Sequence, residues 1–199
     1  MAKEYVAKPL KPSCLQMDGI SAEQITQHYE LLYKGYVAKV NEIWQRLETV
    51  ERSKANQTFS DLRACKSEES FALNGCKLHE YYFDNLGGQG GAPGSKLAEL
   101  IARDFGSFEA WLEDFKATGM TSRGWVILAW DPDIGILRNF GHDAHNVGVI
   151  VNAAPILVMD TYEHGYGIDY GVKRPPYIEA FVKNIDWAVA EARLAALGL

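Results

Sequence analysis

Bulky apolar residues recur at steps of three and four in two long stretches of the first half of the chain. The first stretch carries Ile25, Tyr29, Leu32, Tyr36, Val40, Ile43 and Leu47. This spacing is typical of one face of an α-helix, and Ser21 followed by Gln24 offers an N-terminal capping box. A second stripe runs from Glu68 to Leu86 and stops at Gly87-Gly88, a signal for a helix C-terminus. Together the stripes predict a long antiparallel helical hairpin.

The period of the pattern changes after residue 94. Ser95 and Ser107 are suitable N-caps for two short helices. Apolar runs then predict strands at 125–130, 136–140 and 156–159, with a tight turn over 131–135 joining the first two. Helical spacing returns from Pro176 to Val189 and predicts one C-terminal helix. The expected fold class is α+β, with the hairpin followed by a small three-stranded antiparallel sheet flanked by helices.

The segment between these halves is rich in glycine. Residues 87–94 read GGQGGAPG and contain no apolar anchor, which is typical of a linker. We therefore expect an N-terminal helical-hairpin domain over residues 1–90 and a C-terminal α/β domain over residues 91–199.

Composition and net charge disfavour some classes of binding partner. The 199 residues are 47% hydrophobic and 23% charged, with a net charge of −6, which argues against nucleic acid or an anionic membrane surface as the main partner. The longest apolar stretch, 147–159, is interrupted by Asn152 and Pro155 and is shorter than the roughly 20 residues of a spanning helix. We expect no membrane association.

Cysteine usage and the first residues indicate a reducing compartment. The chain has three cysteines, Cys14, Cys65 and Cys76, and no two of them form a C-x-x-C pair. The opening MAKEYVAKPLKPS lacks the apolar run of a secretory signal. A cytoplasmic location is expected, while the role of the cysteines stays open.

Candidate chemistry lies with the histidines. His28 is one residue from the first stripe and His79 lies within the second, so facing helices could bring both imidazoles together. Asp160 closes an apolar strand and His164 follows four residues later. Three imidazoles and a carboxylate would suit iron or manganese. The alternative, equally compatible with this spacing, is that Asp160 caps a turn and His164 is a core histidine.

A longer pattern surrounds these residues. Residues 155–187, PILVMDTYEHGYGIDYGVKRPPYIEAFVKNIDW, resemble the D-x-W-E-H-A-Y-Y-x-D-Y-x-N-x-R-P-x-Y…N-W signature of iron and manganese superoxide dismutases. Further segments resemble other motifs of that family: SAEQITQHYELLYKGYV, KLHEYYFDNL, RDFGSFEAWLEDF and SRGWVIL. The resemblance covers nearly the whole chain. It implies an enzyme that disproportionates superoxide to dioxygen and hydrogen peroxide at one iron or manganese ion.

The same resemblance implies roles for individual residues. The implied metal ligands are His28, His79, Asp160 and His164. Three further residues are implied to lie around the metal: Tyr36 as a gateway residue, Trp125 as a wall of the site, and His145 as the hydrogen-bond donor to metal-bound solvent. For His145 the alternative is an exposed loop histidine. Glu163 matches an interface glutamate of the family and implies a homodimer.

Several positions depart from the family pattern close to the site. Leu32 and Gly167 replace a histidine and a tyrosine that normally meet across the dimer interface. Gly75 and His145 occupy the two positions where the family carries a glutamine, so the choice between iron and manganese stays open. The departures leave two alternatives to a dismutase: a mononuclear non-haem oxidoreductase or oxygenase on the same fold, and a catalytically weak metal-binding protein.

Overall fold

The computed structural model describes residues 4–199, and its order of elements is α+β as expected. The strands are β1 Trp125–Asp131, β2 Ile136–His142 and β3 Ala154–Asp160. The first-half helices are α1 Ala22–Gln27, a π-helical segment His28–Tyr33, α2 Lys34–Thr49 and α3 Asp61–Asp84. The later helices are α4 Ser95–Phe105, α5 Phe108–Thr121, α6 Gly167–Tyr170, α7 Arg174–Lys183 and α8 Trp187–Ala196. Short 3₁₀ turns lie at Pro12–Leu15, Arg52–Lys54 and Glu163–Gly165.

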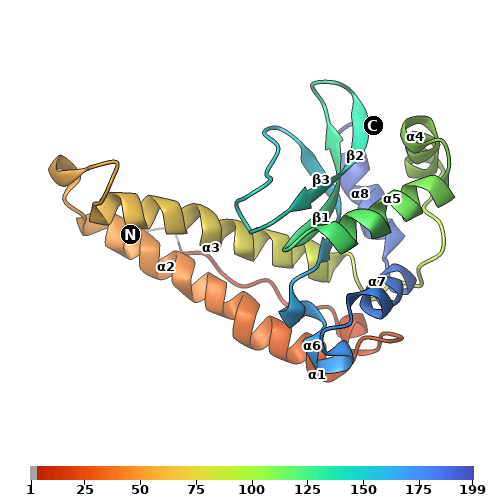
Figure 1. Cartoon of the computed structure of the whole chain (residues 1–199), viewed down its shortest axis with the longest axis horizontal. Coiled ribbons are helices and arrows are strands. Elements are labelled where there is room, and N and C mark those ends of the chain that lie inside the picture. Colours follow the sequence, from red (N-terminus) through yellow and green to blue (C-terminus); the bar gives the residue numbers. More distant parts are fainter. Residues whose placement is uncertain (1–3) are drawn as a thin grey trace.

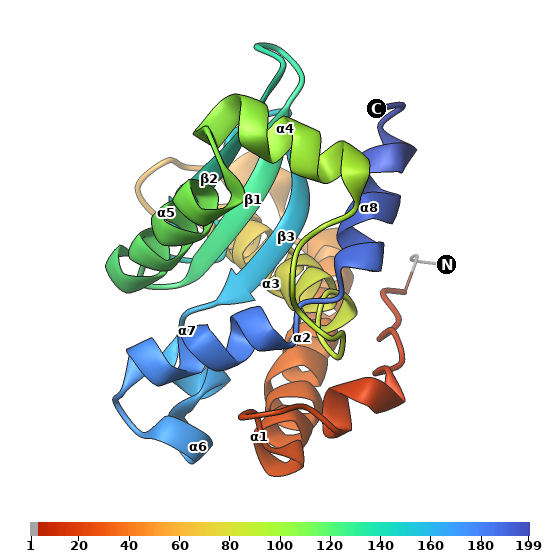
Figure 2. The ribbon, with the colours of Figure 1, turned by 90° about the vertical axis from the view of Figure 1, so that its right-hand side faces the viewer.

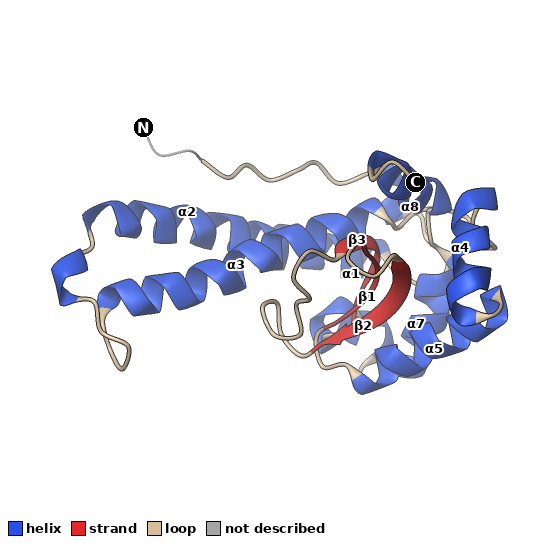
Figure 3. Cartoon of the chain, turned by 90° about the horizontal axis from the view of Figure 1, so that it is seen from above, coloured by secondary structure: helices blue, strands red, loops and turns tan. Residues whose placement is uncertain are grey.

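Helices α2 and α3 form the predicted antiparallel hairpin, which extends well beyond the rest of the molecule (Figures 1 and 3). The predicted start of the second helix at Glu68 is wrong. Helix α3 begins at Asp61 because the Ser60 hydroxyl accepts a hydrogen bond from the Arg63 amide at 3.2 Å. Its first two turns are mostly exposed, so they carry no apolar stripe that could have revealed them.

The first predicted helix is not regular along its length. Ser21 caps it as predicted, accepting from the Gln24 amide at 3.0 Å, but residues 28–33 form a π-helical segment. A π turn holds an extra residue, so the buried stripe shifts by one position. Tyr33 is therefore fully buried, while Leu32, which the periodicity had placed in the core, is only half-buried.

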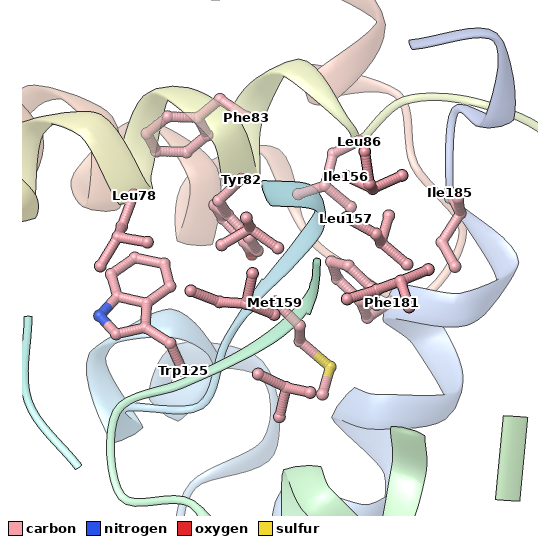
Figure 4. Packing of buried hydrophobic residues seen from close by; sticks show 14 of the residues in the cluster. Leu78, Tyr82, Phe83, Leu86, Trp125, Ile156, Leu157, Met159, Phe181 and Ile185 are labelled. Atoms are coloured by element: carbon pink, nitrogen blue, oxygen red, sulfur yellow. The ribbon is translucent and has the colours of Figure 1, made fainter. Parts of the chain in front are cut away.

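The sheet has the order β2-β1-β3 with both pairs antiparallel. Helices α4 and α5 lie against β1 and β2, whereas α3 and α8 lie against β3 (Figure 2). Figure 4 shows Tyr82 and Phe83 of α3 in the same buried cluster as Trp125 of β1 and Phe181 of α7. The hairpin and the sheet thus share one hydrophobic core.

Two predictions for the second half need correction. Helix α4 begins at Ser95 with Gly94 at the cap position, whereas Ser107 caps α5 as predicted by accepting from the Ala110 amide. The single helix predicted from Pro176 to Val189 is two helices. Asn184 ends α7, and its side-chain amide donates to the carbonyl of Asp18 and back to α7. This break redirects the chain so that α8 packs on β3.

The glycine-rich segment lies against the chain that joins α7 and α8. The Gly88 amide donates to the Asn184 carbonyl at 3.0 Å, and the Gly90 amide donates to the Ile185 carbonyl at 3.1 Å. Its glycines therefore allow close backbone approach in addition to joining two halves. The division into domains over residues 1–90 and 91–199 stays a prediction.

No helix within residues 4–199 combines the length and the apolar character that a membrane crossing requires.

Substitution of Gly88 by alanine tests this backbone packing. An added Cβ would lie 2.3 Å from the Ile185 carbonyl oxygen, so we expect Gly88→Ala to lower the free energy of unfolding by about 1–3 kcal/mol through overpacking. Gly35 in α2 is the matched control, since a Cβ there meets nothing within 4 Å. We expect Gly35→Ala to raise stability by about 0.5–1 kcal/mol. Urea titration of both variants measures the difference, and equal stability would contradict the packing.

Candidate metal centre

Four polar side chains converge from four different elements. They are His28 from the π-helical segment, His79 from α3, Asp160 from the end of β3 and His164 from the 3₁₀ turn Glu163–Gly165. Each offers one ligand atom, and these atoms all lie within 4.8 Å of one another. Asp160 Oδ2 lies 3.1 Å from Nε2 of both His28 and His164, and 3.7 Å from His79 Nε2.

The local structure fixes the orientation of these groups. The His79 imidazole donates from Nδ1 to the Gly75 carbonyl at 2.6 Å, one turn earlier on α3, which leaves the Nε2 lone pair directed at the centre. Asp160 uses Oδ1 to accept from the Tyr162 amide at 2.8 Å, so its other oxygen faces the imidazoles. The Tyr177 hydroxyl donates to the Asp160 main-chain carbonyl at 2.7 Å and fixes the end of β3.

The electrostatics of the cluster suit a cation. Burial lowers the pKa of His28 and lowers that of His79 strongly, so both imidazoles are neutral. Burial would raise the pKa of Asp160, but the His164 imidazole beside it outweighs burial and holds this pKa well below its usual range. Among the described residues, Nε2 of His28 and Nε2 of His79 are buried without a hydrogen-bond partner. A divalent or trivalent metal ion would satisfy these lone pairs and the carboxylate together.

The residues predicted to surround the metal form a hydrogen-bonded chain beside the cluster. Trp125 donates from Nε1 to Nδ1 of His145 at 2.9 Å, and His145 Nε2 lies 2.8 Å from the Tyr36 hydroxyl oxygen. Because Nδ1 accepts, the proton of a neutral imidazole resides on Nε2, and His145 donates to Tyr36. The Tyr36 hydroxyl proton is thereby left free for another acceptor. His145 is 1% exposed, which excludes the exposed-loop alternative.

Both ring nitrogens of His145 are thus engaged, so any effect of this residue on metal-bound solvent would pass through Tyr36. The Tyr36 ring centroid lies 5.4 Å from that of His79, which places the phenol beside the cluster. Burial raises the pKa of Tyr36, so it stays protonated at neutral pH.

The two replaced gate positions border a hollow. Its volume is about 250 Å³, and it is lined by Gln24, Gln27, His28, Leu31, Leu32, His164, Gly167 and Ile168. A Cβ added at Gly167 would meet nothing within 4 Å. The side chain of His164 is 26% exposed here, whereas those of His28, His79 and Asp160 are fully buried. Glu163 is exposed next to it.

Three further residues support the ligands through contacts that the sequence did not predict. Tyr162 stacks on the His164 ring, with centroids 4.9 Å apart and planes inclined by 16°. Tyr177, in the R-P-x-Y motif, supports Asp160, and Gln24 in the predicted capping box contacts the loop that carries His164. The motif could have indicated Tyr177, but no pattern in the sequence predicts that Gln24 reaches this loop.

Comparison with known proteins agrees with the geometry. A family model described as iron/manganese superoxide dismutases, C-terminal domain, matches residues 93–193. A protein of Aquifex pyrophilus named superoxide dismutase (Fe) is 48% identical over 189 residues, covering 92% of this chain and 87% of the relative. One of Cupriavidus metallidurans with the same name is 39% identical, covering 96% and 97%. A Haloferax volcanii protein named superoxide dismutase (Mn) 2 is 35% identical, covering 87% and 86%.

The protonation of His145 is directly measurable. Burial lowers its pKa to about 4, below the roughly 6.5 of an unfolded histidine. The unfolded chain therefore takes up this proton first as pH falls, so the contribution of His145 to stability is complete above about pH 6.5 and is lost toward pH 4. We expect ¹⁵N NMR to show His145 neutral and protonated on Nε2 from pH 8 to about pH 5. Titration near pH 6.5, or a proton on Nδ1, would contradict the hydrogen-bonded chain.

Proposed function

Because the chain belongs to the iron/manganese superoxide dismutase family, we propose that one metal ion is bound by the four converging residues: His28, His79, Asp160 and His164. The protein is a superoxide dismutase, an enzyme that disproportionates superoxide to dioxygen and hydrogen peroxide. The buried, unpaired Nε2 atoms of His28 and His79 beside a carboxylate are the observation that carries the assignment of the ligands. When bound, the ion supplies the one-electron chemistry of both half-reactions.

For the metal itself we propose iron. Relatives at 48%, 47% and 39% identity carry iron in their names, whereas two named for manganese are 35% identical. The three imidazoles and one carboxylate suit either ion, so the ligand set does not separate them. Groups that adjust the reduction potential lie outside the ligands, and here they include the hydrogen bonds of His145.

Tyr36 is the proposed catalytic residue beside the metal, and His145 and Trp125 act through it as positioning residues. Trp125 holds His145 in the tautomer that donates to Tyr36, at 2.9 and 2.8 Å respectively. The Tyr36 hydroxyl is then oriented with its proton available to a solvent molecule or to the reduced substrate at the centre. The chain of hydrogen bonds thus supplies a proton at one defined atom.

We propose that the enzyme is a homodimer with Glu163 at the interface. The hollow beside His164 is rimmed by the exposed aliphatic side chains of Leu31, 67% exposed, and Ile168, 45% exposed. A second copy on this face would bury them and close the opening at which the His164 side chain is accessible. Glu163 lies on the same turn as His164 and is exposed toward such a partner.

A cytoplasmic location is also proposed. It is supported by the cysteines, which are all free: Cys14, Cys65 and Cys76.

Removal of one ligand tests the centre. His79→Ala deletes a fully buried imidazole, so we expect less than a tenth of the wild-type metal content and no measurable superoxide disproportionation. Elemental analysis of protein produced with iron and with manganese gives both the stoichiometry and the preferred metal. We expect about one iron per chain in the active wild-type protein.

His142→Ala is the matched control. His142 is also buried, at 5% exposure, but lies outside the cluster, so the variant should keep its metal and its activity. Equal metal loss in both variants would point to general unfolding instead. Full activity in metal-depleted His79→Ala would refute the proposed centre.

A charge on the aliphatic rim tests the dimer. Leu31→Glu places a carboxylate in the proposed interface, and we expect sedimentation to show a monomer where the wild type is a dimer. Ile134→Glu is the control, because Ile134 is 66% exposed in the turn between β1 and β2. A wild-type monomer, or a dimer that tolerates Leu31→Glu, would exclude this face.

A further inference from the structure

Among the four proposed ligands, His164 has the most exposed side chain. The other three side chains of the centre are fully enclosed, but that of His164 is 26% exposed at the edge of the hollow. The residue lies on a three-residue 3₁₀ turn, and a short helix, α6, begins only three residues later. Short elements of this kind make few internal hydrogen bonds, so an external contact has to fix where the imidazole lies.

Gln24 supplies such a contact from α1. Its side chain is 1% exposed, and both polar atoms of its amide bind the loop that carries the ligand. Nε2 donates to the His164 carbonyl at 2.6 Å, and Oε1 accepts from the Ile168 amide at 3.0 Å. One rigid planar group thereby joins two points of the loop that are four residues apart.

The main chain at Gln24 is also held by hydrogen bonds. Its main-chain amide donates to the Ser21 hydroxyl at 3.0 Å, which caps α1. The Ser21 amide in turn donates to the Asp169 carboxylate at 2.8 Å, so the start of α1 is bound to α6. The contact therefore links α1, the helix just before His28, to the loop of His164.

The location coincides with the departure from the family pattern. Gln24 lines the hollow that Leu32 and Gly167 leave between α1 and the ligand loop. No side chain at Gly167 can brace the loop, and a Cβ there would meet nothing within 4 Å.

We propose that Gln24 is a positioning residue, which holds the His164 loop through both ends of its amide and so sets the placement of the His164 imidazole at the metal. The proposal rests on the proposed function, since it assumes that His164 is a ligand. Gln24 does not touch the reacting atoms. Its effect is on how firmly, and in which orientation, the imidazole binds.

Two substitutions distinguish the effect of losing the hydrogen bonds of Gln24 from the effect of adding a charge. Gln24→Met keeps a similar volume and removes both bonds without adding charge. Gln24→Glu keeps the acceptor for Ile168 but replaces the donor to His164 with a carboxylate oxygen. For both variants of the iron-loaded protein we expect metal transfer to a chelator to be about 10–100-fold faster than in the wild type. We also expect a changed rhombicity of the ferric EPR signal.

Gln27→Met is the matched control. Gln27 lines the same hollow one turn along the helix, but its amide donates only to Glu23 and not to the loop. We expect the wild-type EPR signal and the wild-type release rate. This control accounts for any general effect of losing a glutamine on this face.

Thermal unfolding of all variants, with and without iron, completes the test. A lower unfolding temperature in Gln24→Met with an unchanged EPR signal and release rate would overturn the proposal, because Gln24 would then only stabilise α1. An effect in Gln24→Glu alone would also overturn it, since charge would be the cause. Failure of the wild-type chain to bind iron, or retention of iron by His79→Ala, would refute the proposed function itself.

Discussion

One carboxylate oxygen, Asp160 Oδ2, is the point at which the elements of the fold meet. It lies 3.1 Å from the Nε2 atoms of His28 and His164 in a site that excludes water from three of its four side chains. An unpaired carboxylate in such surroundings would be costly, and the imidazoles beside it offset only part of that cost. A bound cation would offset the remaining cost of burying this charge. The segment of His28 leads into α2 and His79 lies on α3, whereas Asp160 and His164 come from the end of β3 and the turn after it. The ion therefore also joins both halves of the fold.

Strand β1 places the groups around this oxygen. Trp125 stands opposite Asp160 on one neighbouring strand and opposite His142 on the other, so the register of the sheet determines where its indole lies. From there the indole donates to His145. A shift of register would therefore move both a ligand and the donor that sets the histidine tautomer. Positioning of the metal and positioning of the proton depend on the same backbone hydrogen bonds.

Much of this arrangement could be predicted from the chain. Helical periodicity predicted the hairpin, and apolar runs bounded by turn residues predicted the three strands. The two apolar stripes predicted that His28 and His79 lie close together, because side chains on the facing sides of two antiparallel helices lie opposite one another. The early start of α3 was missed because its first turns are solvated, and the break at Asn184 because the apolar spacing continues across it. The Gln24 contact depends on a loop 140 residues away, which no local pattern reports.

The π-helical segment at His28–Tyr33 determines how the parts of the helix on either side of it face. A regular helix turns by about 100° for each residue, and a π turn takes up one extra residue without that additional rotation. The part before the segment carries Gln24 and Ile25, and the part after it carries Tyr36 and Val37. If the segment became a regular α-helix with every residue kept, the second part would rotate by about 100° relative to the first. The π turn therefore lets the chain carry one more side chain beside the centre than a regular helix whose two ends face the same way.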